Sequence, residues 1–204
     1  EPLAAIQEDT SNLALSDTAE RIEIAQTSAN FFDVFGVTPV HGRLFTPADE
    51  QAGHEPIVVL GHALWQSRFG GDSRLIGKPI RLDGRNYTVV GIAPAGFQYP
   101  GKTEAWLPPL RLVPELFPDQ DVTQTRGMGY LSAVAFFKPG VPVTQAAAEM
   151  ETITTRLRQQ YPESNNNRFN KVVSLHEHLV GETNKMLWLL FGAVTFVLLI
   201  ACAN

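Results

Sequence analysis

Cysteine is almost absent from this sequence. Cys202 is the only one among 204 residues, so no internal disulfide can form and a disulfide-rich secreted scaffold is excluded. Cys202 lies inside an apolar run, where we expect it to behave as a small hydrophobic residue and not as a nucleophile. The chain also begins at Glu1 without an initiator methionine or a signal peptide, and it ends within an apolar run. We therefore interpret it as a fragment of a longer protein.

Clusters of basic residues are also lacking. The chain has 16 Lys and Arg against 21 Asp and Glu, which gives a formal net charge of −5, and the basic residues are scattered. Binding to a phosphate backbone requires clustered positive charge, so nucleic acid is excluded as a partner. Apolar residues make up 44% of the chain and charged residues 18%, which is the composition of a folded globular protein.

A long hydrophobic run is the strongest feature that is present. Residues 186–204 read MLWLLFGAVTFVLLIACAN and contain no charged side chain. Nineteen residues of helix span about 28 Å, close to the ~30 Å of a hydrocarbon core, and Trp188 lies near one end as an interfacial anchor would. The run predicts the start of a transmembrane helix over 183–204. The scarcity of basic clusters before it fits an extracytoplasmic location for residues 1–185, but the run alone leaves the orientation open. The alternative is a buried helix of a soluble protein, but such helices normally carry a polar stripe.

The sequence before residue 108 predicts short strands and short helices. Asp83-Gly84 between two alternating runs is a strong hairpin signal. The expected elements are strands at 3–6, 21–25 and 57–60, a short helix ending near Val34, a helical turn from Pro47, a helix over 63–69 closed by Gly70-Gly71, and hairpin strands at 80–82 and 87–90.

A proline-rich break at 108–129 is the expected linker, and the pattern changes after it. We predict a strand over 130–137, a helix from Thr144 to Tyr161 and a strand over 171–175, which together make a βαβ unit. The predicted class is α+β. One split unit comprises residues 1–27 and 125–182, and a smaller mixed unit with its linker, residues 28–124, is inserted into it.

Two motifs could carry chemistry. His176 and His178 lie two residues apart on the expected strand, so both imidazoles could bind one zinc ion, with His41, His54 or His62 as a third ligand. A solvated strand end is the competing interpretation. The stretch 71–79, GDSRLIGKP, partly matches a phosphate-binding loop, but Asp72 stands where its first glycine belongs and Pro79 follows Lys78 where Ser or Thr is needed.

No other motif predicts catalysis. The sequence contains no Gly-x-Ser-x-Gly nucleophile elbow. Asp49-Glu50 begins a helical turn, which favours complementation of the helix dipole over acid–base chemistry. Phe31, Phe32 and Phe35 are expected to be core residues, with a partner surface as the alternative. We assign no catalytic, cofactor-binding or metal-binding residue, and we do not expect an enzyme.

An ordered set of short matches resembles the MacB-type periplasmic core domain of FtsX/MacB-family ABC transporter permeases. The residues are Ser28–Phe32, Val34, Gly36-Val37, Pro39, Gly42-Arg43, Val58–Leu60, Leu64-Trp65, Phe69–Asp72, Ile76-Gly77, Leu82, Gly84, Tyr87–Ile92, Pro94, Gly96-Phe97, Lys138–Val141 and Leu179–Gly181. The final run, 198–204, is similar to the helix that opens the permease segment. Within this family, the sequence most resembles the duplicated permeases of acidobacteria. His176, His178 and Phe136-Phe137 depart from the pattern.

The resemblance implies a domain that lies between the first and second transmembrane helices of a permease in the bacterial cytoplasmic membrane. It implies a porter-like split unit and an inserted Sabre-like subdomain. The implied partners are a cytoplasmic ABC ATPase, a second copy of the chain in a dimer, membrane lipid around residues 186–204, and a periplasmic adaptor. The implied function couples ATPase-driven motion to export or release of a substrate. A signalling scaffold that regulates a cell-wall hydrolase is the alternative, and a membrane-anchored enzyme is the third hypothesis.

Overall fold

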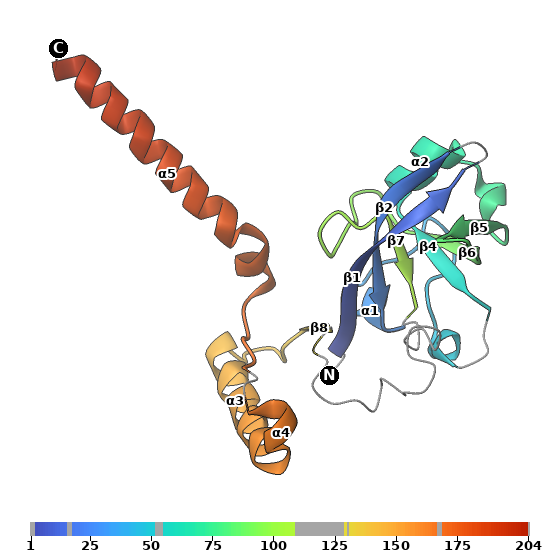
Figure 1. The fold of residues 1–204 in the computed structure, drawn as a ribbon, viewed down its shortest axis with the longest axis horizontal. Helices are drawn as coiled ribbons and strands as arrows, with labels where there is room; N and C mark the ends of the chain where they lie inside the picture. The colour runs from blue at the N-terminus through green and yellow to red at the C-terminus, as the bar shows by residue number, and fades with distance from the viewer. Residues whose placement is uncertain are drawn as a thin grey trace. The chain divides into compact units, whose positions relative to one another are not determined.

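The computed structural model describes residues 3–15, 18–51, 55–108, 129, 131–166 and 169–203, with the backbone alone for 181–187. Contacts within the chain group it into two compact units, Glu1–Phe136 and Phe137–Asn204. The first is rich in strands and the second in helices (Figure 1). The predicted α+β class is confirmed.

Six strands of the first unit form a closed circuit. The strands of this unit are β1 (Leu3–Ala14), β2 (Ala19–Thr27), β3 (His41–Gly42), β4 (Ile57–Leu60), β5 (Pro79–Leu82), β6 (Arg85–Ile92), β7 (Ala105–Leu107) and β8 (Ser132–Ala135). Neighbours follow the order β2-β7-β4-β6-β5-β1, and β1 pairs again with β2, which closes the circuit. The short strands β8 and β3 add to β1 and β6.

The sequence of the turn explains the hairpin formed by β5 and β6. β5 and β6 pair in antiparallel register from Pro79↔Thr88 to Leu82↔Arg85. The two residues between them, Asp83 and Gly84, have φ of 44° and 81°, which is the left-handed backbone that a tight two-residue turn requires. The predicted hairpin is therefore confirmed.

Both faces of the central strands are buried, by two separate apolar clusters. Val58 and Leu60 of β4 belong to the first cluster, and Ile57 and Val59 belong to the second, as the two-residue period of a strand dictates. The helix α2 (His62–Phe69) contributes Leu64 and Trp65 to the first cluster. The short helix α1 (Phe31–Val34) contributes to the second cluster, which also holds Trp106.

Several local expectations in this unit are confirmed. α2 ends at Gly70, whose φ is 63°, and a 3₁₀ turn, η1, covers Pro47–Glu50. A second 3₁₀ turn, η2, covers Ser73–Leu75. The predicted strand at 130–137 is shorter in the structure and corresponds to β8.

The second unit consists of the helices α3 (Val143–Gln160), α4 (Pro162–Asn165) and α5 (Leu175–Ala203). The prediction of a strand over 171–175 is wrong: residues 171–174 form no strand, and α5 begins at Leu175. The helix begins here because Ser174 caps it. The Ser174 Oγ accepts a hydrogen bond from the backbone N–H of Glu177 at 3.1 Å.

Two further expectations concern the division of the chain. β1 and β2, which were expected in the split unit, pair in one sheet with β5 and β7 of the expected insertion. The division into 1–27 with 125–182 and 28–124 stays a prediction. The expected linker at 108–129 lies almost wholly outside the described residues. Among the residues that the structure describes, no helix is both long enough and apolar enough to cross a membrane.

Candidate functional site

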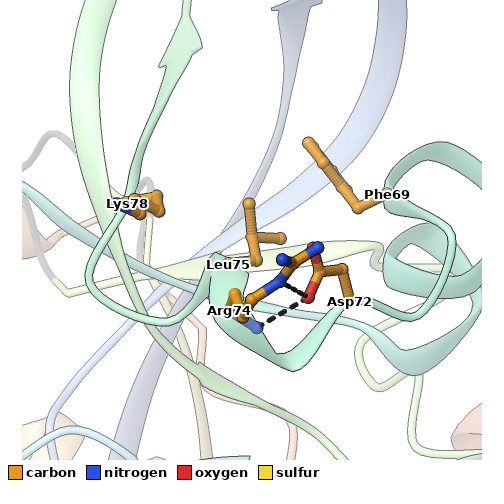
Figure 2. A pocket seen from close by; sticks show the side chains of 5 residues that line it. All are labelled: Phe69, Asp72, Arg74, Leu75 and Lys78. Carbon is orange, nitrogen blue, oxygen red and sulfur yellow. Dashed lines mark hydrogen bonds and ion pairs between the residues drawn. The ribbon is translucent and has the colours of Figure 1, made fainter.

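Two hollows lie next to each other on the first unit, around the end of α2. The larger, of about 650 Å³, is lined by Phe69, Asp72, Arg74, Leu75 and Lys78 (Figure 2). The second, of about 510 Å³, is lined by Ala14, Leu15, Arg68, Phe69, Pro79, Ile80, Arg81 and Asn86. Phe69 lines both hollows, so they are neighbours, and we call the two together the Phe69 hollow.

Figure 2 shows how the larger part is arranged. Phe69 of α2 and Leu75 of η2 point in the same direction and form the apolar part, and Lys78 lies on the far side of Leu75 from Phe69. Asp72 and Arg74 form an ion pair beside them, with 2.9 Å between Arg74 Nη2 and Asp72 Oδ2. The hydrogen bonds from the Arg74 side chain and backbone lower the pKa of Asp72.

Residues 71–79 form the turn around η2, and several of them also line the Phe69 hollow. Asp72 caps η2, since its carboxylate accepts a hydrogen bond from the backbone N–H of Arg74 at 2.9 Å. Its carboxylate thus occupies the turn where a phosphate loop would offer free N–H groups.

The histidines are not brought together as the zinc hypothesis required. His176 and His178 lie in the first turn of α5 and not on a strand. Residues two apart on a helix point to different faces, so the predicted two-ligand geometry is wrong. His41 and His62 each make an edge-on contact with the ring of Trp65, with centroids at 5.3 and 5.5 Å. His54 lies outside the described residues.

No group of three or more His, Cys, Asp or Glu side chains that could hold a metal ion occurs within the described ranges. Cys202 is exposed in the last turn of α5.

Asp49 and Glu50 have separate structural roles. Asp49 accepts hydrogen bonds from both Nη atoms of Arg43, at 2.7 and 2.9 Å, and from the Thr46 backbone and hydroxyl. Burial raises the pKa of Asp49, but these hydrogen bonds outweigh it, so the pKa is lowered overall. Glu50 accepts a hydrogen bond from the Ala29 backbone. The pair anchors η1 to its surroundings and does not converge on a cavity.

The phenylalanine cluster is part of the core, as predicted. Phe31 and Phe32 are buried, and their rings contact each other and the rings of Phe35, Phe45 and Trp106. Phe35 is partly buried against the same cluster. The Phe69 hollow, by contrast, is a surface that sequence reasoning missed.

Comparison with known proteins decides the family. The family of the MacB-like periplasmic core domain matches residues 3–153. The chain belongs to this family. It is the periplasmic domain of a MacB/FtsX-like ABC transporter permease.

Solved structures support the fold. The periplasmic region of MacB from Actinobacillus actinomycetemcomitans has a TM-score of 0.58 at 15% identity, covering 81% of this chain and 69% of that one. A domain of a protein named as a permease from Porphyromonas gingivalis gives 0.57 at 18% identity, covering 81% and 68%. At such identities the likeness shows the fold alone. No curated protein matches this chain.

Proposed function

We propose that this periplasmic domain couples motion driven by a cytoplasmic ABC ATPase to the export or release of a substrate. In this proposal two copies of the chain form a dimer outside the membrane, membrane lipid surrounds residues 186–204, and a periplasmic adaptor binds the domain. The family match supports a role in transport. The continuous helix α5 supports the coupling of ATPase-driven motion to the domain.

α5 is one uninterrupted helix from Leu175 to Ala203, a stretch of 29 residues. The helix thus begins eight residues before the span over 183–204 that the sequence predicts. A helix transmits displacement along its axis, whereas a flexible linker would absorb it. This continuity supports coupling between the membrane end of the chain and the residues that precede α5.

The apolar side chains of α5 support lipid as the surrounding medium. Large apolar residues from Trp188 to Ile200 are exposed, including Trp188 at 69% and Phe196 at 66%. The residues of this run with described side chains, 188–203, extend over about 24 Å at 1.5 Å per residue, less than the ~30 Å of a hydrocarbon core. The membrane span predicted over 183–204 therefore also needs residues 183–187, whose side chains are not described.

Breaking α5 tests the coupling. In the complete permease, reconstituted with its ATPase in liposomes, four residues of Gly-Ser-Gly-Ser are inserted after His178. The matched control inserts four alanines at the same point, which preserves the helix. The readout is an environment-sensitive dye on Glu55→Cys, an exposed residue of the first unit, in a Cys202→Ser background.

We expect ATP to change the dye signal in the unaltered permease and in the alanine control, and to leave it unchanged in the Gly-Ser variant. ATP hydrolysis should continue in all three. A dye response that survives the Gly-Ser insertion would overturn the coupling role of α5. A dimer that hydrolyses ATP and recruits a cell-wall hydrolase, with no substrate exported, would favour the signalling scaffold.

A further inference from the structure

The Phe69 hollow has an apolar floor that is not fully covered by the rest of the fold. Phe69, Leu75 and Leu15 are only partly buried where they pack against the first core cluster. Phe69 lies at the end of α2, Leu75 in η2 and Leu15 just after β1, so three separate segments present apolar surface at one place. Both parts of the hollow are open to solvent, which suits an extended chain better than an enclosed small molecule.

The rim of the hollow is basic. Four basic side chains line it, Arg68, Arg74, Lys78 and Arg81, against one acidic side chain, Asp72. Arg68 is paired with Glu20, and Arg74 is paired with Asp72. In each of these two ion pairs the acidic side chain balances the positive charge of the arginine.

Lys78 and Arg81 carry the remaining positive charge. Both are exposed, and no acidic partner is recorded for either within the part of the chain that the structure describes. The Arg81 Nε donates to the carbonyl oxygen of Gly84 at 3.0 Å, which holds the side chain but leaves its charge uncompensated. Arg81 and Pro79 lie on the outward face of β5, because the strand alternates exposed and buried residues.

An excess of positive charge is unusual on this molecule, whose formal net charge is −5. A cluster of positive charges on a protein surface attracts negatively charged segments and repels positively charged ones. A ligand that complements this hollow needs carboxylates that reach Lys78 and Arg81 and apolar side chains that cover Phe69 and Leu75.

We propose that the Phe69 hollow is the docking site for an acidic segment of a partner protein in which carboxylates alternate with large apolar side chains. The inference rests on the proposed function, which places a partner outside the membrane, and it deepens that function by naming the surface and the chemistry of the segment. A Leu or Phe side chain of the partner packs on Phe69 and Leu75. Its flanking Glu or Asp side chains pair with Lys78 and Arg81.

The test uses the complete permease in nanodiscs of uncharged phosphatidylcholine. The probe is a fluorescein-labelled peptide of sequence ELEFELE, and fluorescence anisotropy measures its binding. We expect dissociation constants in the range of tens of micromolar at low salt, weakened several-fold at 0.5 M NaCl because salt screens exposed charge. The peptide KLKFKLK should not bind.

The decisive variant is Lys78→Glu/Arg81→Glu, which should weaken binding of ELEFELE about ten-fold or more. The matched control is Arg21→Glu/Lys102→Glu, which changes the net charge equally but lies outside the lining of both parts of the hollow. It should bind within about two-fold of the unaltered chain. Lys78→Ala alone provides a milder variant, and circular dichroism confirms that each variant is folded.

Three results would overturn the proposal. The first is no binding of ELEFELE to the unaltered chain. The second is equal weakening by both double variants, and the third is binding of phosphatidylglycerol vesicles through Lys78 and Arg81 where the peptide does not bind. The last result would assign the hollow to an anionic lipid surface. All three leave the ATP-driven dye response of the proposed function unaffected, so the two proposals fail separately.

Discussion

Arg43 and Asp49 form a two-pronged ion pair in which the carboxylate is almost completely covered. The Asp49 side chain is 5% exposed, whereas that of Arg43 is 49% exposed. The same carboxylate accepts hydrogen bonds from the Thr46 backbone and hydroxyl, so it joins the segment after β3 to η1. A covered carboxylate with four donors should matter for stability.

Asp49→Asn should lower the free energy of unfolding by about 2 kcal/mol, because an amide retains the shape but loses the charged hydrogen bonds to Arg43. Urea denaturation of the chain in detergent, followed by circular dichroism, measures the change. Asp33→Asn is the control, since Asp33 is exposed in α1, and it should shift stability by less than about 0.5 kcal/mol. Equal losses in both variants would contradict the assignment.

The stability that Asp49 contributes should depend on pH in a defined direction. Its pKa is lowered in the folded chain below the ordinary value of 3.8. A carboxylate with a lowered folded pKa contributes stability that is present above the unfolded pKa and is lost as the pH falls through the folded pKa. The difference in unfolding free energy between the unaltered chain and Asp49→Asn should therefore be constant near pH 7 and shrink below about pH 4. A difference that grows on acidification would refute this.

Gly91 and Gly42 permit a close approach between β3 and β6. A Cβ atom placed on Gly91 would lie 2.0 Å from the Arg43 carbonyl oxygen, a backbone atom that cannot move aside alone. Gly91→Ala should therefore destabilise the chain by about 3 kcal/mol.

Gly77→Ala is the control for this substitution. Gly77 has φ of 80° but open space around it, so alanine there meets backbone strain without a steric clash. It should cost only about 1 kcal/mol. Thermal denaturation of the two variants separates the clash from the strain, and a smaller loss for Gly91→Ala than for Gly77→Ala would show that β3 and β6 are not held this closely.

Asp83 reinforces the junction between β1 and β5, which share only two paired residues, Leu13↔Leu82 and Ala14↔Arg81. Its carboxylate accepts hydrogen bonds from Ser11 Oγ at 2.6 Å, from Asn12 N at 3.0 Å and from Asn12 Nδ2 at 2.8 Å. Asp83→Ala should increase the amide hydrogen exchange of residues 12–14 about ten-fold or more, while exchange in β4 changes little. Unchanged protection at residues 12–14 would show that the strand pairing closes this junction alone.

Local features of this fold are readable from sequence, and long-range pairings are not. Asp83-Gly84 predicts its hairpin because two residues specify the turn. β7 was missed, since Ala105–Leu107 is short and becomes a strand only by pairing with β2 and β4. A strand was predicted over Lys171–Leu175, but Ser174 caps a helix that begins at Leu175. Ser174 with Glu177 three residues later is a capping signal that could have indicated this.

The Phe69 hollow was not predictable for a similar reason. Phe69, Lys78 and Arg81 are unremarkable in sequence, and only the packing of α2 beside η2 and β5 collects them into one surface. The family, by contrast, was predicted from short matches spread along the chain. Their order is preserved even where each single match is weak, and the family match over residues 3–153 confirms it.

The central claim is that ATPase-driven motion reaches the periplasmic domain. Electron paramagnetic resonance can measure the distance between spin labels on Glu55→Cys in the two copies of a reconstituted Cys202→Ser permease. The account predicts different distance distributions in the nucleotide-free and ATP-trapped states. Identical distributions in a permease that hydrolyses ATP would contradict it.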